Sequence, residues 1–273
     1  MKRLSDVLPA ALGSRLDPSA SGGPPSNPPA QEDYTATLHD QPKCPRCRDA
    51  GFVRRNLTPL HPDFGKIYPC DCRRQQQQDT YRLRVEMSHL PTATVETHRF
   101  STWQHLRHLS PIFAQVQQFT AGQAAHPFLT LVGRPGTGKT HLALAIAWDW
   151  LETGRGTVVY YQVEEFLDTL RRGYNREGAT VTEDTYHALN FAMTASLLVL
   201  DDLGAEKSTE WAEAKLDELI DNRYINRRPL VVTSNLGMSS LAPRIADRLA
   251  EGQVFILKTG SYRQRGHQEP PSE

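Results

Sequence analysis

Residues 133–140 read Gly-Arg-Pro-Gly-Thr-Gly-Lys-Thr and meet the phosphate-loop pattern in full. Glycines in such a loop let successive backbone N–H groups turn toward phosphate oxygens. The Lys139 ammonium would then reach the β and γ phosphates, and the Thr140 hydroxyl would ligate Mg2+. We therefore predict a site for ATP and Mg2+. Its predicted nucleotide-binding residues are Gly133, Pro135, Gly136, Thr137, Gly138, Lys139, Thr140, His141 and Asp201.

Residues 196–202 supply a second element that such a site needs, because an apolar run ends there in two carboxylates. In a parallel sheet, ligands gather at the carboxyl ends of the strands, so Asp201 is expected beside the loop. We predict that Asp201 holds Mg2+ through water and that Asp202 orients or deprotonates the attacking water. The alternative is an ordinary turn after a core strand, and the phosphate loop upstream makes that interpretation less favoured.

All four cysteines lie in one short window, with Cys44 and Cys47 in a C-x2-C pair and Cys70 and Cys72 in a C-x-C pair. Two close thiolate pairs can surround one Zn2+ ion, and we predict a four-thiolate zinc site. A redox-active pair is the rival interpretation. His61 lies between the pairs and could replace a cysteine, although a loop histidine is more often solvated.

The region around the cysteines is basic, with ten Lys or Arg against four Asp from Lys43 to Arg84, whereas the whole chain has a formal net charge of +0. Four thiolates on Zn2+ would lower the local excess by about two charges. The region could therefore contact nucleic-acid phosphates, and any such contact would be local and salt-sensitive. A basic, solvated surface is the alternative.

Strand and helix patterns alternate around the phosphate loop. Apolar runs predict strands at 128–132, 156–161, 196–202, 230–233 and 254–257, and helical spacing predicts helices at 141–151, 163–172, 210–224 and 241–250. Such alternation indicates a parallel sheet covered by helices on both faces. The predicted fold class is α/β, a nucleotide-binding core with a small zinc-binding module.

A chain of 273 residues with 38% hydrophobic content fits one sizeable domain plus appendages. We expect a disordered segment and linker at 1–39, a zinc-binding module at 40–74, a linker helix at 75–95, an ATPase domain at 96–265 and a disordered tail at 266–273. No stretch approaches about 18 uninterrupted apolar residues, and the first residues lack the signal-peptide pattern. We therefore expect a cytoplasmic protein.

Three motifs carry a family resemblance. Residues 136–143, 200–206 and 261–263 read Gly-Thr-Gly-Lys-Thr-His-Leu-Ala, Leu-Asp-Asp-Leu-Gly-Ala-Glu and Ser-Tyr-Arg. They look like the AAA+ ATPases that load replicative helicases, the bacterial DnaC and DnaI type, and the cysteine module resembles the zinc-binding N-terminal part of some loaders and phage relatives. The resemblance implies a five-stranded AAA+ P-loop core, self-assembly into a ring or spiral, and ATP bound between neighbouring subunits.

The resemblance also implies roles for individual residues. Asn235 in Val-Thr-Ser-Asn looks like the sensor that polarises the attacking water, with a turn cap after a strand as the alternative. Arg244 and Arg248 lie one helical turn apart and project from one face. In the family an arginine here reaches the neighbour's γ-phosphate, and Arg248 is the preferred candidate. Arg263 looks like the second sensor, acting on the nucleotide of its own subunit.

The stretch after the second strand of the core is where the resemblance implies a channel for single-stranded DNA. Aromatic rings there could stack on bases while arginines hold phosphates. The rings are more typical of a core at this helical spacing, so only Arg171 and Arg172 are retained as DNA-contacting candidates. The aromatic residues in question are Tyr160, Tyr161, Phe166 and Tyr174.

Asp202 departs from the family pattern, because many AAA+ proteins have Glu at this position. A shorter side chain would position water less well and slow hydrolysis. The leading hypothesis is an ATP-dependent loader that grips a hexameric replicative helicase of the DnaB type through its N-terminal region and places it on single-stranded DNA. The runner-up is a transposition helper ATPase of the IstB type, which binds duplex DNA. A non-hydrolysing nucleotide switch is the third hypothesis.

Overall fold

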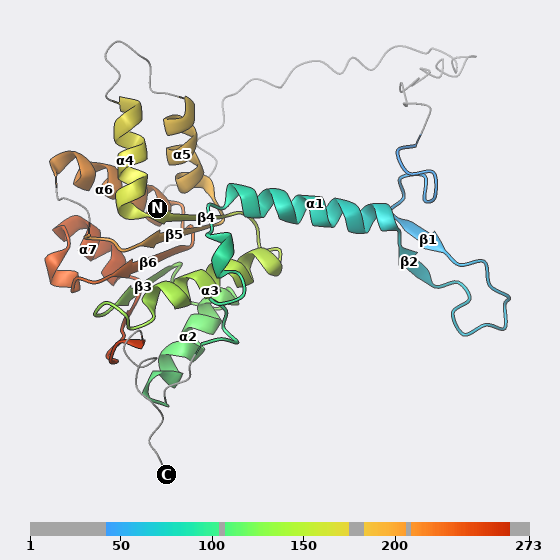
Figure 1. Cartoon of the computed structure of the whole chain (residues 1–273), viewed down its shortest axis with the longest axis horizontal. Coiled ribbons are helices and arrows are strands. Elements are labelled where there is room, and N and C mark those ends of the chain that lie inside the picture. Colours follow the sequence, from blue (N-terminus) through green and yellow to red (C-terminus); the bar gives the residue numbers. More distant parts are fainter. Residues whose placement is uncertain (1–41, 104–106, 175–182, 206–208, 263–273) are drawn as a thin grey trace, which may run out of the picture. The chain divides into compact units, whose positions relative to one another are not determined.

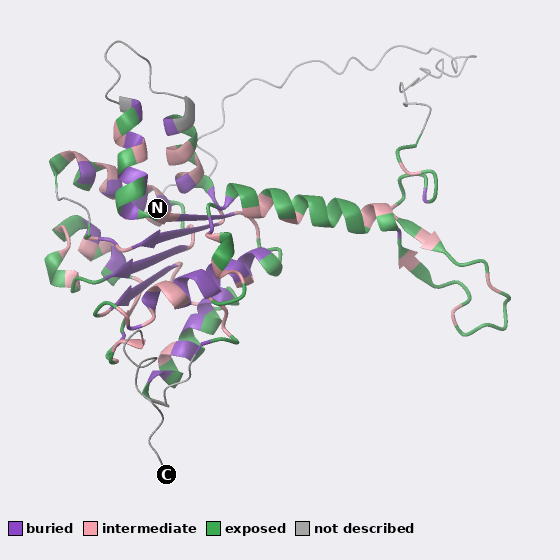
Figure 2. Ribbon diagram, viewed as in Figure 1, coloured by how far each residue is buried: buried purple, intermediate pink, exposed green. Residues whose placement is uncertain are grey.

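The computed structural model describes residues 42–103, 107–174, 183–205 and 209–262. Five strands form one parallel sheet in the order β4-β5-β6-β3-β7, which confirms the predicted fold class (Figure 1). The strands are β3 (Phe128–Val132), β4 (Val158–Gln162), β5 (Leu197–Asp201), β6 (Leu230–Ser234) and β7 (Gln253–Ile256). Every residue of β3, β5 and β6 is buried, as expected for parallel strands covered on both faces (Figure 2).

Helices cover both faces of this sheet and complete two apolar clusters. α2 and α3 contribute to the cluster on one face, together with Leu129 and Val199. α4, α6 and α7 contribute to the cluster on the other face, with Leu198 and Val232. The helices of this part of the chain are α2 (Ser110–Thr120), α3 (Lys139–Glu152), α4 (Val163–Tyr174), α5 (Glu183–Thr194), α6 (Glu210–Ile225) and α7 (Pro243–Ala250).

The sequence patterns predicted the five strands of the sheet and four of its helices but missed two further helices. α2 and α5 were not predicted, although both contribute residues to the apolar clusters. β4 begins two residues later than predicted, at Val158, after Gly156 with φ at +121°. Short 3-10 turns also connect the elements, namely η2 (Thr92–Thr94), η3 (Arg107–Leu109) and η4 (Met238–Ser240).

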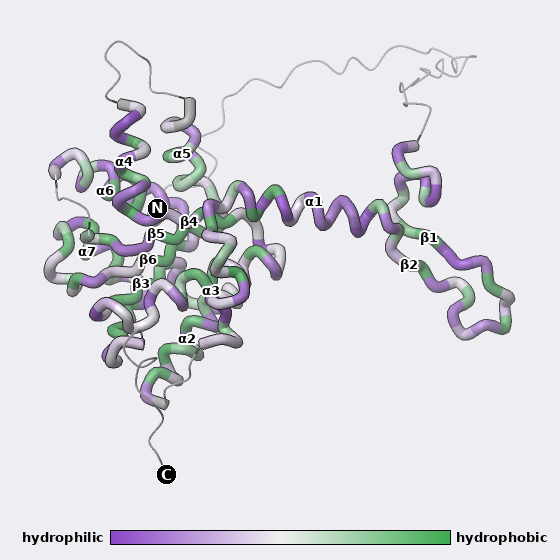
Figure 3. The backbone as a smooth tube through the Cα atoms, viewed as in Figure 1, coloured by the Kyte–Doolittle hydropathy of each residue, from purple (hydrophilic) through white to green (hydrophobic). Residues whose placement is uncertain are grey.

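A small antiparallel hairpin and a polar helix precede the sheet in the sequence. β1 (Phe52–Arg54) pairs with β2 (Ile67–Pro69), and α1 (Asp71–Met87) follows directly. α1 has no buried residue, and it is largely hydrophilic in contrast to the apolar strands of the sheet (Figure 3). α1 overlaps the linker helix predicted at 75–95, although it begins and ends earlier in the sequence.

Some of the sequence predictions fall outside the described residues. These are the terminal segments 1–39 and 266–273 and the sensor candidate Arg263. The predicted domain limits stay predictions. Within the described ranges, no helix combines the length and apolar character that crossing a bilayer requires.

Candidate nucleotide-binding site

The phosphate loop joins the end of β3 to the start of α3, as the sequence predicted. Gly136 and Gly138 have φ values of +80° and +94°, which favour glycine. A Cβ on Gly138 would lie 2.6 Å from Trp103, and one on Gly136 would lie 2.3 Å from the Ser261 hydroxyl. Gly138 is also the N-cap of α3, so the loop presents the positive end of a helix dipole.

Lys139 is 5% exposed, and its ammonium is held inside the loop. It donates to the carbonyl oxygens of Gly133 at 3.0 Å and Arg134 at 3.2 Å, and to Asn235 Oδ1 at 2.7 Å. Thr137, which is 1% exposed, donates from Oγ1 to the Arg134 carbonyl at 2.9 Å. Gly133 and Thr137 therefore shape the loop, and Lys139 is the cation available to a phosphate.

Asp201 lies at the carboxyl end of β5 and is 2% exposed. Thr140 Oγ1 donates to Asp201 Oδ1 at 3.1 Å, and Thr233 Oγ1 donates to the same oxygen at 2.5 Å. The Tyr160 hydroxyl donates to Oδ2 at 2.8 Å. Burial raises the pKa of Tyr160 far above its ordinary value, and the Asp201 charge acts in the same direction, so the phenol keeps its proton. A buried carboxylate with hydroxyl donors on both oxygens has a fixed orientation, as a metal-binding carboxylate requires.

Asp202 follows in the left-handed conformation, with φ at +60°. Its backbone N–H donates to Thr233 Oγ1 at 2.9 Å, which fixes this turn against β6. Its carboxylate accepts from Asn235 Nδ2 at 2.9 Å. Asn235 therefore connects Asp202 to Lys139, and the two predicted water-orienting residues are neighbours.

Many of these groups line one cavity of about 340 Å³. Most of the predicted nucleotide-binding residues are in its lining. Gly133, Thr137 and Asp201 are not, but Gly133 and Asp201 accept hydrogen bonds from the lining residues Lys139 and Thr140. The full lining comprises His98, Thr102, Trp103, Pro135, Gly136, Gly138, Lys139, Thr140, His141, Asp202, Asn235 and Tyr262.

Four of the lining residues, His98, Thr102, Trp103 and Tyr262, were not predicted. The Trp103 ring lies 5.3 Å from His141 and 5.9 Å from Tyr262 between centroids. His98 lies 4.9 Å from His141, and burial followed by the His141 charge lowers the pKa of His98. The Tyr262 N–H donates to the Gly136 carbonyl at 2.9 Å, so residues distant in sequence meet on the loop. Tyr262 falls within the Ser-Tyr-Arg motif at 261–263, whereas Trp103 lies 30 residues before Gly133 and no local pattern indicated it.

The two arginines of α7 pair with acidic residues of α6 rather than lining the cavity. Arg244 Nη1 lies 3.1 Å from Asp217 Oδ2, and the Arg244 side chain is 77% exposed. Arg248 Nε lies 3.0 Å from Asp221 Oδ1, and its side chain is 34% exposed. The Arg248 guanidinium also stacks over the Tyr224 ring at 4.5 Å. Arg244 is therefore the more accessible of the two candidates for reaching a neighbouring subunit.

Arg171 and Arg172 lie in the last turn of α4, away from the cavity. Arg171 pairs with Asp168 at 3.0 Å and stacks over Trp211 at 5.3 Å. Arg172 Nε donates to the Asp168 carbonyl at 3.2 Å. Tyr160, which lies in the same stretch that the family resemblance associates with DNA, is instead a core residue whose hydroxyl donates to Asp201.

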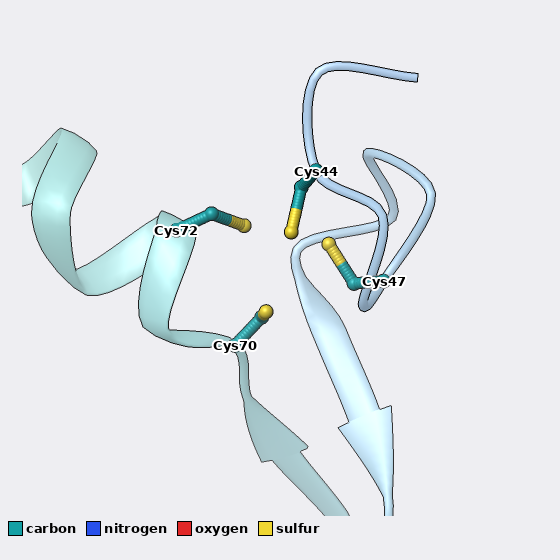
Figure 4. A group of neighbouring side chains, drawn as sticks. All are labelled: Cys44, Cys47, Cys70 and Cys72. Carbon is teal, nitrogen blue, oxygen red and sulfur yellow. The ribbon is translucent and has the colours of Figure 1, made fainter. Parts of the chain in front are cut away.

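The four cysteine side chains point toward one another (Figure 4). Their sulfur atoms all lie within 4.8 Å of one another, with Cys47 and Cys70 buried and Cys44 and Cys72 half-buried. The Arg48 N–H donates to the Cys44 carbonyl at 2.8 Å, and the Asp49 carboxylate accepts from the Cys44 N–H at 2.9 Å. Such local bonds fold the first pair into a tight turn.

The geometry of the cysteine cluster fits zinc. A tetrahedral ion with Zn–S distances of about 2.3 Å places its sulfur ligands about 3.8 Å apart, which the observed spacing accommodates. Thiolates are also the ligands that zinc prefers, and the cluster needs no contribution from His61. Four cysteines therefore form a chemically complete candidate metal site.

Comparisons with known proteins agree with this geometry. The family described as "IstB-like ATP binding protein" matches residues 72–269. The replicative helicase loader DnaC of Escherichia coli strain K12 is 27% identical to the chain over 176 residues, which are 62% of this chain and 69% of DnaC.

Two solved structures are similar to the fold. The crystal structure of the DnaC helicase loader has a TM-score of 0.52 and 21% identity, covering 60% of this chain and 98% of that one. AMPPCP-bound DnaA from Aquifex aeolicus has a TM-score of 0.54 and 16% identity, covering 63% of this chain and about half, 51%, of that one. These likenesses show an AAA+ fold. Because the family match extends over well more than half of the sequence, the chain belongs to the IstB-like ATP-binding proteins.

Proposed function

We propose that this protein is a cytoplasmic ATPase that loads a hexameric replicative helicase of the DnaB type onto single-stranded DNA, in replication initiation or restart. The single observation that carries the proposal is the sequence similarity to the E. coli loader DnaC over 176 residues. The cavity described above supplies the nucleotide site that such a protein requires.

The chain's own residues have distinct roles in this proposal. Backbone N–H groups of the phosphate loop bind the phosphates of ATP, and the Lys139 ammonium leaves its carbonyl partners to contact the β and γ phosphates. Thr140 and Asp201 would hold Mg2+, and the ion would supply positive charge beside the phosphates. Asp202 and Asn235 orient the attacking water, since their side chains are bonded to each other and line the cavity.

The aromatic residues that line the cavity are assigned to the nucleobase. Trp103 and Tyr262 place ring atoms beside Gly138, and His98 also lines the cavity. Flat apolar rings stack well on a purine. The phosphate loop and these aromatic residues together would therefore bind both ends of ATP.

Assembly would complete the site. One arginine of α7, Arg244 or Arg248, would reach the γ-phosphate of a neighbour in a ring or spiral, and Arg263 would act on the nucleotide of its own subunit. Arg171 and Arg172 are retained as weaker candidates for contact with single-stranded DNA. The zinc-bound cysteine module is proposed to dock the helicase.

Mixing the full chain with the replicative helicase of its host, with ATP and Mg2+, tests this proposal. Light scattering should show a joint complex of defined mass, and Lys139→Ala should lose the ATP dependence of its assembly or release. Cys70→Ser should lose the complex while retaining ATP binding. No complex under any nucleotide condition would reject the loader function.

The family match also favours a second candidate function, that of a transposition helper ATPase of the IstB type. That protein would assemble on duplex DNA and bind a transposase, so filament formation on duplex DNA without helicase binding would support it. A non-hydrolysing switch is distinguished from both by phosphate release, because it would bind ATP without turnover. Asp202, one methylene shorter than Glu, is the residue that motivates this last alternative.

A further inference from the structure

Tyr160 lies in the middle of β4, on the sheet face that α3 covers. The parallel register of β4 and β5 places Tyr160 opposite Val199 and Gln162 opposite Asp201. Side chains alternate along a strand, so Tyr160, Val199 and Asp201 share one face. Strand spacing and rise put the Cα atoms of Tyr160 and Asp201 roughly 8 Å apart, a diagonal that a phenol can span.

The contacts of Asp201 define what Tyr160 does there. The Tyr160 hydroxyl donates to Oδ2 at 2.8 Å from a side chain that is 6% exposed. Thr140 and Thr233 donate to Oδ1 from the opposite side. Because each carboxylate oxygen has a donor from a different element, the carboxylate has one favoured orientation.

We propose that Tyr160 is a positioning residue for Mg2+, because it holds Asp201 Oδ2 and so keeps Oδ1 turned toward Thr140. The inference rests on the proposed function, which assigns Thr140 and Asp201 to the ion. Outer-shell partners of this kind typically change metal affinity by about 10- to 100-fold when they are removed. Loss of the Tyr160 hydroxyl should therefore weaken the metal site without removing any metal ligand.

Tyr161 provides a matched control on the neighbouring residue. It belongs to the opposite face of β4, packs against the other apolar cluster and stacks on Phe166 with a centroid distance of 4.6 Å. Tyr161→Phe also removes a phenol hydroxyl from β4, but on the other face of the sheet. It should leave the metal site unchanged.

The measured quantity is the factor by which Mg2+ tightens binding of a non-hydrolysable ATP analogue, taken as the Kd in EDTA divided by the Kd in Mg2+. Isothermal titration calorimetry on the full chain gives both values without any turnover. Tyr160→Phe should lower this factor about tenfold with the EDTA value unchanged, and Tyr161→Phe should leave both values unchanged. A folded Tyr160→Phe protein with the wild-type factor would overturn the inference.

Two further variants separate this inference from the proposed function. If wild type gains nothing from Mg2+, or Asp201→Asn keeps the full factor, the proposed metal site itself fails. Should Tyr160→Phe not fold, the double variant Tyr160→Phe/Asp201→Asn removes the donor and the buried charge together. Its factor should equal that of Asp201→Asn alone, because Tyr160 acts only through this carboxylate, and a lower factor overturns the proposal.

Discussion

The nucleotide cavity and the cysteine cluster are two candidate metal sites that are held by different kinds of structure. Asp201 is 2% exposed and receives hydrogen bonds from α3, β4 and β6, all packed on a continuous sheet. The hairpin and α1 that carry the second cysteine pair have no buried apolar core, and α1 has no buried residue. The sheet can therefore position its site before a metal binds, whereas we expect the cysteine region to fold only with a bound metal.

The two sites also differ in how far apart their residues lie in the sequence. Each cysteine pair is formed by residues two or three positions apart, and local turns such as the bond from the Arg48 N–H to the Cys44 carbonyl shape the first pair. The cavity collects residues from His98 to Tyr262, so it depends on the order of strands in the sheet. Removing the metal should therefore disrupt mainly the cysteine region, whereas replacing single side chains should disrupt mainly the nucleotide cavity.

The largest expected effect is metal removal from the cysteine cluster. Structural zinc sites contribute about 10–16 kcal/mol in small modules, so a strong chelator or Cys70→Ser should unfold the hairpin. Hydrogen exchange should become fast across 44–69 and stay slow in β3, β5 and β6. Readdition of zinc should restore protection in the wild type but not in Cys70→Ser. Equal metal content in Cys70→Ser and wild type would contradict the four-thiolate site.

Lys139→Ala should abolish nucleotide binding while the sheet stays folded. Lys139 is the cation enclosed by the loop, where its ammonium donates to the Gly133 carbonyl. Fluorescence titration with a labelled ATP measures the affinity, and circular dichroism checks the fold. Lys215→Ala, which breaks a surface pair with Glu218, is the matched control. Normal ATP affinity in Lys139→Ala would remove the phosphate-loop assignment.

Replacing Arg244 and replacing Arg248 in α7 should have different effects, because the two side chains differ in exposure. Arg244→Ala should lower ATP hydrolysis at concentrations where the protein self-assembles, by about 10³-fold or more if it stabilises the transition state in a neighbour. Arg248→Ala should instead cause a small loss of stability, because it removes the surface ion pair with Asp221. Phosphate release against protein concentration measures the first effect. The reverse pattern would assign the role to Arg248.

The smallest expected effect is the pH dependence caused by His98. Its pKa is lowered below 6.5, by burial first and then by the His141 charge, so the unfolded chain binds the proton more readily. Stability is therefore complete above about pH 6.5 and falls as pH drops toward the lowered pKa. His98→Gln should flatten the change of Tm between pH 7.5 and 5.5. An unchanged slope would show that His98 titrates alike in both states.

Much of the fold was predictable because its signals are local. The apolar strands and the helices after them follow from short runs of residues, and the glycines of the loop explain its turns. α2 and α5 were missed because their patterns are weak, and their places depend on packing against α3 and α4. The cysteine cluster was predictable because spacing alone brings each pair together.

The sequence by itself determined the ATP-binding family, the phosphate loop, Asp201 at the end of a buried strand and the four-cysteine cluster. Only the tertiary structure placed Tyr160 against Asp201, brought Trp103 and Tyr262 together in the lining of the cavity and left Arg244 more exposed than Arg248. The physical reason is that these contacts depend on strand order and register. Hydrogen bonds and turns between neighbours in sequence are fixed by residue type, whereas contacts across strands form only once the sheet has folded.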